Sequence, residues 1–462
     1  MGKLKKYVYN LGMNIKTLEN RSLLFFGKSR AFAKDEFEAQ MLHHNITILK
    51  EYSSEVKVVV EGRMMTPYEQ NDSAALYESQ NLEFISIDVL ERLLAQNIDE
   101  DTLLMSLKLS HDKERLKEFL TNSMISETLF FKLLKIYSWG GEDFFENDEN
   151  RDVTAALIGR FYENIERNHN VQYATHGLMH LIAQTKNADL IEVISELEPL
   201  ERSFNSSEKS ANFSILSAIA THSASSVKVL KRIIKRGSSY LKTLVAMRSD
   251  CDAKMQEILF NDGDESVLEA LSYNSYLSRE LITKLSVTKK YAKNIATFVK
   301  LNESIFVEFL EDYSVDLAAN ETLDFSMQER LIELHEDKVR VALASNSHIE
   351  EKFINELVSE GSADINFAIY ENIKTPQTTL EVAYENEINH FALSYNENTP
   401  KHLLKLLAQS SDERVLKGVA KNESTPVEVL YQLQLDSRFE RDVKENKAFG
   451  KHIQSENIGW LV

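Results

Sequence analysis

Two short clusters of basic residues have the composition of anion-binding sites. In the first, Gly27, Lys28, Ser29 and Arg30 follow an apolar run and precede a helical pattern. A glycine loop that leads into a helix presents free backbone N–H groups, and these groups attract anions. The four residues are therefore a candidate anion site, with a plain strand-to-helix turn as the alternative.

The second cluster lies in the segment "VKVLKRIIKRGSSYLK", the only dense basic patch in the long helical part of the chain. Its candidate nucleic-acid contacts are Lys228, Lys231, Arg232, Lys235 and Arg236. Spacings of three and four residues place all of these except Lys231 along one helix face. A row of cations is what a line of phosphates requires.

Other reactive residue types are not arranged for catalysis. His176 and His180 share a helix face, but Gly177 follows His176 where a zinc protease motif has its glutamate. Cys251 is the only cysteine, so no internal disulfide or cysteine-ligated metal is expected. The chain contains no GxSxG, Walker A or GxGxxG motif. We therefore expect no enzyme activity, no metal and no cofactor.

Composition and charge point to an acidic protein with several folding units. The chain has 462 residues, of which 43% are hydrophobic, and its net charge is −19. Residues 1–34 carry eight basic residues and one acidic residue, so the remainder carries about −26. Nucleic-acid binders usually have a basic footprint. A protein or peptide partner is therefore expected, with basic partners favoured.

No feature of the sequence predicts a membrane or an exported location. No run of eighteen apolar residues is present, and the first residues lack the apolar core of a secretion signal. We expect no membrane contact and a cytoplasmic location. The sequence does not specify an oligomeric state.

The patterns that position the glycine loop alternate between strand and helix. Strands are expected at residues 22–27, 45–52, 56–62 and 82–86, and helices are expected at residues 33–44, 71–80 and 87–97. This order predicts an α/β domain with a parallel-type sheet and helices on both faces. A basic arm at residues 1–17 precedes the domain.

The pieces "LLFFGKS", "VKVVVEG" and "FISIDVLERLL" resemble, in order and length, those of a BRCT domain over residues 18–96. Val89 occupies the position in the last helix where the family has a tryptophan. Phe26 stands where phosphopeptide-binding members have Ser or Thr, and Asp72 or Ser73 where they have lysine. The resemblance implies a four-stranded sheet, a docking role and a link to DNA repair or replication. It does not imply a phosphate pocket of the family type.

The rest of the chain carries a repeated phrase that ends in asparagine. Clear copies, 24 or 26 residues apart, end at Asn346, Asn372, Asn396, Asn422 and Asn446. Looser copies end at Asn274, Asn302 and Asn320. A regular period in the twenties predicts stacked helical repeats, so residues from 100 onward are expected to be almost wholly helical.

The phrase has the signals of a helix end followed by a helix start. Asn is expected to close one helix in the left-handed conformation. Thr is then expected to cap the next helix, with Pro at its first position. Residues 425–428 and 347–350 have the spacing of capping boxes, so Thr425 and Ser347 are the expected caps.

The motif "NESTPVEVLYQL" resembles the leucine-rich repeat variant family, a right-handed helical solenoid in the style of HEAT and armadillo repeats. The expected solenoid covers residues 205–450, with a helical region at 97–204 that begins the array and a tail at 451–462. Some members of the family carry an iron–sulfur module, which a chain with one cysteine cannot hold.

These features favour a non-enzymatic scaffold or adaptor for protein–protein interaction. The alternative is a nucleic-acid-binding protein that uses the basic arm and a helical groove. Aromatic residues at repeat positions are expected to be core rather than ligand contacts. They are Tyr273, Phe367, Tyr370, Phe391 and Tyr395.

Overall fold

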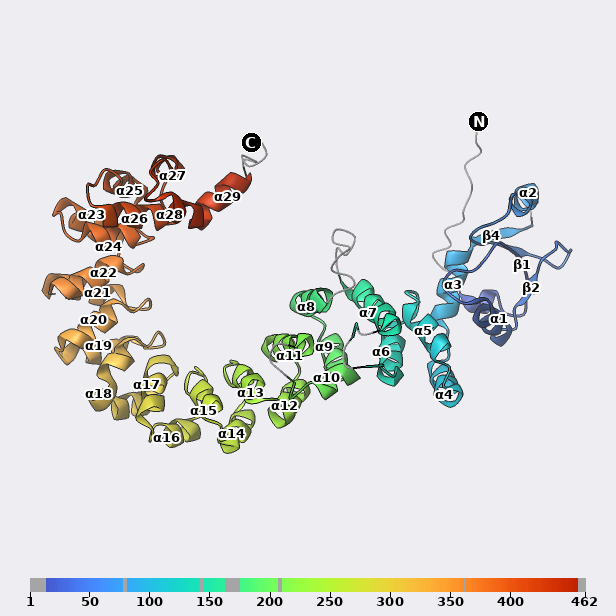
Figure 1. Ribbon diagram of the computed structural model, residues 1–462, viewed down its shortest axis with the longest axis horizontal. Helices are drawn as coiled ribbons and strands as arrows, with labels where there is room; N and C mark the ends of the chain where they lie inside the picture. Colours follow the sequence, from blue (N-terminus) through green and yellow to red (C-terminus); the bar gives the residue numbers. More distant parts are fainter. Residues whose placement is uncertain are drawn as a thin grey trace. The chain divides into compact units, whose positions relative to one another are not determined.

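The computed structural model describes residues 14–77, 81–141, 144–145, 147–162, 175–206, 210–360 and 362–455. The chain forms two compact units, residues 1–245 and residues 246–462. Helices dominate both units, and one small sheet lies near the start of the first (Figure 1). Within the described ranges, no helix is long and apolar enough to cross a bilayer.

The predicted α/β domain is confirmed as a four-stranded parallel sheet with the order β2-β1-β3-β4. Its strands are β1 (Ser22–Phe26), β2 (Thr47–Leu49), β3 (Val58–Glu61) and β4 (Glu83–Ser86). Its helices are α1 (Lys34–His43), α2 (Pro67–Leu76) and α3 (Ile87–Gln96). A short 3₁₀ helix, η1 (Ile15–Thr17), precedes β1.

Alternating side chains of β1 divide the sheet into two buried faces. Leu24 and Phe26 form one core with Val59, against which Leu76 of α2 packs. On the other face, the ring of Phe25 lies 5.4 Å from the ring of Phe37 in α1. The crossovers that contain α1 and α2 run in opposite directions from the centre of the sheet, so right-handed connections place these helices on opposite faces.

The helix α2 begins four residues before its predicted start. Thr66 is its N-cap, and the side chain of Thr66 accepts the backbone N–H of Glu69 while Glu69 accepts the N–H of Thr66. This capping box, followed by Pro67 at the first helical position, was missed because residues 66–70 carry no apolar periodicity.

The remaining helices of the first unit follow directly from the sheet. They are α4 (Glu100–Ser110), α5 (Lys113–Thr121), α6 (Glu127–Ile136), α7 (Asp148–Phe161), α8 (Thr175–Gln184), α9 (Ala188–Ser195), α10 (Glu198–Arg202), α11 (Ala211–Thr221), α12 (Val227–Arg236) and α13 (Ser239–Ala246). The α/β domain packs against this array. Phe32 meets Phe119 edge-on at 6.4 Å, and Nε of Arg115 donates to Glu36 at 2.8 Å.

The regular elements of the second unit are all helices in the ranges that the structure describes. They are α14 (Ala253–Asp262), α15 (Glu265–Ser272), α16 (Arg279–Leu285), α17 (Lys289–Phe298), α18 (Glu303–Ala318), α19 (Phe325–Glu333), α20 (Asp337–Ala344), α21 (Glu351–Glu360), α22 (Ala363–Glu371), α23 (Gln377–Glu385), α24 (His390–Tyr395), α25 (Lys401–Leu407), α26 (Glu413–Lys421), α27 (Val427–Gln434), α28 (Glu440–Glu445) and α29 (Lys447–Ser455). The prediction of helix without strand after residue 100 is confirmed for the described residues.

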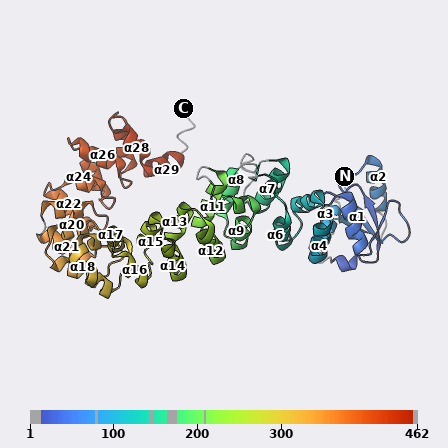
Figure 2. The same ribbon diagram turned by 60° about the horizontal axis from the view of Figure 1, so that its bottom comes forward.

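The helices of the second unit alternate between two layers of a curved stack (Figures 1 and 2). In the inner layer, each of α20, α22, α24 and α26 packs on the next. The helices α19, α21, α23, α25 and α27 pack on members of this layer and form the second layer. Helix α18 belongs to both layers because its backbone breaks at Tyr313, where φ is −133°.

The repeated asparagines form what we call the asparagine ladder, a row of buried side chains that connects successive repeats. The amide nitrogen of Asn396 donates to the backbone oxygens of Tyr370 at 2.9 Å and Asn372 at 2.7 Å. Its side-chain oxygen accepts the N–H of Asn398 at 2.8 Å. The members, each of which donates to two carbonyls of the preceding repeat, are Asn274, Asn320, Asn346, Asn372, Asn396, Asn422 and Asn446.

The ladder corrects the predicted role of asparagine. Asn372 and Asn422 have φ of −75° and −66°, which is not left-handed, because the side chain must reach back to the preceding repeat. Asn302 is an exposed N-cap of α18 and is not a ladder member. Its neighbour Val299 supplies a carbonyl that Asn320 uses instead.

The predicted threonine caps are wrong. The hydroxyl of Thr425 donates to the carbonyl of Val419 at 2.7 Å, at the end of the preceding helix, and Pro426 takes the N-cap position. The same arrangement recurs at Thr375 and Thr399. Because these threonines are buried against the helix that has just ended, their hydroxyls satisfy its carbonyls.

The second predicted capping box is also absent. The hydroxyl of Ser347 donates to Glu321, and the N–H of Glu350 donates to the side chain of Gln328 at 3.0 Å. The expected N–H donor therefore bonds to the preceding repeat rather than to the expected cap.

Candidate functional site

The glycine loop is held in place by a carboxylate from the first turn of α2. Gly27 has φ of +79°, and a Cβ at this position would lie 2.5 Å from the carbonyl oxygen of Arg63, so only glycine fits. The N–H of Gly27 donates to Glu69 at 3.0 Å. This bond and those to Thr66 lower the pKa of Glu69. The carboxylate of Glu69 is therefore the anion that binds the N–H of Gly27.

A second internal carboxylate occupies the next two amides. The N–H groups of Arg30 and Ala31 donate to one oxygen of Glu91 at 2.7 and 2.8 Å, and Glu91 is fully buried. The hydroxyl of Ser29 donates to Phe32 at 2.9 Å. The expected free N–H groups are therefore not free. An external anion would meet the side chains of Lys28 and Arg30, and the anion site stays a prediction in that form.

The basic patch on α12 faces acidic residues of the helices before it. Lys228 contacts Glu192 at 2.8 Å and Glu196 at 2.7 Å. Arg232 and Arg236 both pair with Glu201. These three cations recur every four residues and lie against α9 and α10. The glutamates of these neighbouring helices therefore neutralise most of the charge of the basic patch.

The remaining two cations of the patch, Lys231 and Lys235, are exposed. The hydrogen bonds to Glu192 and Glu196 raise the pKa of Lys228, whereas burial lowers the pKa of Arg232. A phosphate would therefore have to compete with existing ion pairs for Lys228, Arg232 and Arg236. Nucleic-acid binding by this patch stays a prediction.

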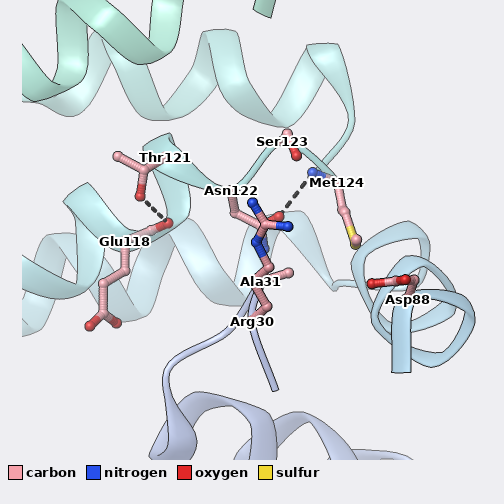
Figure 3. A pocket seen from close by; sticks show the side chains of 8 residues that line it. All are labelled: Arg30, Ala31, Asp88, Glu118, Thr121, Asn122, Ser123 and Met124. Carbon is pink, nitrogen blue, oxygen red and sulfur yellow. Dashed lines mark hydrogen bonds between the residues drawn. The ribbon is translucent and has the colours of Figure 1, made fainter. Parts of the chain in front are cut away.

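A pocket of about 280 Å³ lies between the α/β domain and the α5–α6 turn (Figure 3). The α/β side contributes Arg30, Ala31 and Asp88, and the helical side contributes Glu118, Thr121, Asn122, Ser123 and Met124. The hydroxyl of Thr121 donates to the carbonyl of Glu118 at 3.0 Å. The side-chain oxygen of Asn122 accepts the N–H of Met124 at 2.9 Å. We call it the Arg30 pocket.

The histidine and cysteine residues do not form a reactive site in the described part of the chain. His180 is exposed on α8, and the side chain of His176 lies outside the described residues. Burial raises the pKa of the Cys251 thiol to about 12, which keeps it protonated and unreactive at neutral pH. No three His, Cys, Asp or Glu side chains converge as metal ligands there.

A half-exposed apolar row runs along the inner layer of the second unit. Six of its seven members lie one or five residues before a ladder asparagine, and positions four residues apart share one helix face. The seventh, Phe298 of α17, joins the row through its ring contact with Tyr273. Tyr273 and Phe298 are 36% and 46% exposed, with ring centroids 5.1 Å apart. The members of this apolar row are Tyr273, Phe298, Val315, Val341, Phe367, Phe391 and Tyr395.

The row corrects part of the expectation that the repeat aromatics are core. Tyr370 is buried, with 4% exposure. Phe367 and Phe391 stack at 5.9 Å and remain partly exposed, and Arg414 lies 5.9 Å from the ring of Phe391. The partial exposure of these rings shows that the second layer of helices does not fully cover this face.

Charge in the second unit is strongly acidic. Residues 246–462 contain 38 acidic and 23 basic residues, a net charge of −15. Residues 301–337 hold eleven of the acidic residues and a single basic residue, Arg330. Arg330 pairs with Glu303 at 2.8 Å. The apolar row therefore crosses a region with a large excess of negative charge.

Sequence reasoning missed the residues that matter most in the first unit. Glu69 and Glu91 resembled ordinary helix surface residues, and nothing local marks Asn122 as buried. Only the capping spacing from Thr66 to Glu69 was a usable signal. The chain matches no family model, no curated protein and no solved structure.

Proposed function

We propose that this protein is a non-enzymatic scaffold that binds a basic segment of a protein partner along the apolar row. In this proposal the second unit is an α-solenoid of 24–26-residue repeats in the style of the leucine-rich repeat variant family. The α/β domain is BRCT-like and forms one end of the first helical array.

The observation that carries the proposal is the row itself. Its rings are held at fixed spacing by helices that the asparagine ladder connects, so the surface is preorganised. Aromatic rings on a unit with a net charge of −15 suit Lys and Arg side chains, because these can stack on the rings while the negative charge of the unit attracts them. Arg414 over Phe391, at 5.9 Å, is an internal example of such a contact.

The α/β domain supports an adaptor role through its packing rather than through a phosphate pocket. The contacts of Phe32 with Phe119 and of Glu36 with Arg115 join the domain to the first helices. The N–H of Gly27 already bonds to Glu69. We therefore propose docking of a protein surface here and do not propose phosphopeptide recognition.

Nucleic-acid binding is the weaker candidate. It relies on the basic arm and on the α12 patch. In that patch Lys228, Arg232 and Arg236 already pair with glutamates, which leaves Lys231 and Lys235 exposed. A strongly acidic chain would also repel a polyanion over most of its surface.

Fluorescence anisotropy with the full-length protein tests the proposal. A labelled Lys/Arg-rich peptide should bind, and an Asp/Glu-rich peptide of the same length should not. Phe391→Ala should weaken binding by about tenfold, a change of roughly 1.4 kcal/mol. Leu435→Ala is the control, because Leu435 is 89% exposed and lies at the end of α27, outside the row.

Three results would contradict the proposal. They are equal binding of the acidic peptide, no binding of the basic peptide, and equal weakening by Phe391→Ala and Leu435→Ala. Short duplex DNA in the same assay, at several salt concentrations, tests the nucleic-acid alternative.

A further inference from the structure

The Arg30 pocket contains a buried hydrogen-bond donor with no partner. Asn122 is 4% exposed, and its side-chain oxygen accepts the N–H of Met124. Its amide nitrogen is buried and bonds to no protein atom of the described residues. Leaving such a donor unpaired destabilises a folded protein, so unpaired donors of this kind often mark a place that a ligand or water fills.

The same pocket contains a cation that no ion pair uses. The backbone of Arg30 is fixed by the bond from its N–H to Glu91. Its side chain reaches from this loop toward the turn that carries Asn122 (Figure 3). Among the described residues, none forms an ion pair with Arg30, and the residue is exposed. An arginine whose backbone is fixed and whose guanidinium has no ion-pair partner suits a planar ligand with two acceptor oxygens.

The charges around the pocket limit what that ligand is. Asp88 is already matched, because Arg63 donates to both of its oxygens at 3.0 and 2.8 Å. Glu118 adds one negative charge at the pocket wall. Among the described residues that line the pocket, Arg30 is the one cation, and together with Glu118 it leaves no net positive charge. A singly charged carboxylate therefore meets less repulsion here than a dianionic phosphate does.

We propose that the Arg30 pocket binds a carboxylate group, through the guanidinium of Arg30 and the side-chain amide of Asn122. The hydroxyl of Ser123, which is exposed on the same wall, supplies a third donor. This site lies in the first unit and does not depend on the apolar row, so it goes beyond the scaffold proposal.

Calorimetric titration of the full-length protein tests the site with four probes. Triglycine has a terminal carboxylate, triglycine amide lacks it, succinate is a small organic acid, and inorganic phosphate is the competing anion. Triglycine or succinate should bind, and phosphate should bind more weakly. Binding of triglycine but not of its amide assigns a peptide C-terminus, whereas binding of succinate alone assigns a small acid. Either result supports a carboxylate site.

Three variants test the residues. Arg30→Gln should reduce carboxylate affinity at least tenfold, and Asn122→Asp, which replaces the donor with an acceptor, should reduce it as much. Lys34→Gln removes an exposed cation four residues away, outside the candidate anion site, and should change affinity less than twofold. Because Asn122 is buried, circular dichroism must show that its variant folds. If it does not, the comparison of Arg30→Gln with Lys34→Gln decides.

The proposal fails if no carboxylate probe binds or if phosphate binds more tightly than both carboxylates. It also fails if Lys34→Gln weakens binding as much as Arg30→Gln, since the cause would then be net charge. The anisotropy assay with the basic peptide remains a separate measurement, so failure here leaves the scaffold proposal to its own test.

Discussion

The side-chain amide of Asn396 donates to the backbone carbonyl of Asn372 at 2.7 Å, and Asn372 in turn donates to the carbonyl of Asn346 at 2.8 Å. Each ladder asparagine is thus a donor to one repeat and, through its backbone, an acceptor from the next. Both amide hydrogens are used, and the side chains are buried. A helical array stacked only by apolar side chains would tolerate small shifts between repeats, whereas these bonds fix the register.

Removing one ladder side chain should destabilise the second unit strongly. Asn396→Ala deletes two donated bonds and leaves the carbonyls of Tyr370 and Asn372 without these partners. The expected loss is about 2–4 kcal/mol, measured by urea unfolding. Asn386→Ala, at an exposed position, should change stability by less than about 0.5 kcal/mol. Equal effects of the two changes would contradict the ladder.

Thr425→Asp distinguishes the observed hydrogen bond from a helix cap. Aspartate is a favourable N-cap, so a capping role predicts no loss of stability. In the structure the hydroxyl of Thr425 donates to Val419, and a buried carboxylate at this place would face a carbonyl oxygen. We expect a loss of more than about 2 kcal/mol in the same unfolding assay. A variant as stable as the parent would restore the capping interpretation.

Gly418→Ala should destabilise α26 although alanine favours helix by about 1 kcal/mol. A Cβ on Gly418 would lie less than van der Waals distance from the side chain of Ser394 in α24, with the Ser394 Cβ only 2.8 Å away. The second change Ser394→Gly removes this obstacle and should recover part of the loss. Thermal unfolding of the single and double variants measures the coupling. Additive effects would show that the two helices are not in close contact.

Glu91→Ala should destabilise the first unit because it removes the acceptor for the N–H groups of Arg30 and Ala31. The expected loss is about 2–4 kcal/mol, since both donors lose their partner inside the protein. Glu91→Gln keeps a side-chain oxygen in the same place and should lose less. If glutamine is no better than alanine, the negative charge rather than the hydrogen bonds maintains the loop.

Glu69 should contribute to stability in a pH-dependent way. Hydrogen bonds from Gly27 and Thr66 lower its folded-state pKa below the ordinary value of 4.5. The folded chain therefore binds this proton less readily than the unfolded chain, so the stabilisation is present above pH 4.5 and is lost as the pH falls through the lowered pKa. Glu69→Gln should flatten the fall in urea midpoint below about pH 5. Glu38→Gln, on the exposed side of α1, should leave the slope unchanged.

The elements were predictable where burial follows a simple period. Strands such as β1 and β3 are short apolar runs, and the repeated phrase marked the helical array. The roles of its polar residues were not predictable. The asparagines of the clear copies depend on a neighbour 24 to 28 residues away, and Thr425 depends on the end of the helix six residues before it. Asn396 and Thr425 carry local signals for helix ends, but their hydrogen bonds satisfy the carbonyls of segments already folded.

The same limit explains the sites. Lys228 and Arg232 form a basic stripe in sequence, and only the packing of α12 on α9 and α10 reveals their glutamate partners. Arg30 was identified as a candidate from its loop. Its companion Asn122 was not, because ninety-two residues separate them in the chain and the contact between the α/β domain and α5 brings them to one pocket.

All of the ladder bonds point in one direction along the chain: the later repeat donates and the earlier repeat accepts. From Asn446 back to Asn346, the acceptors lie 24 to 28 residues upstream. During synthesis a ribosome releases the accepting carbonyls first. Each new repeat therefore emerges after the repeat that supplies its acceptors. The order of synthesis thus matches the order of bonding, and the array is polar in its assembly.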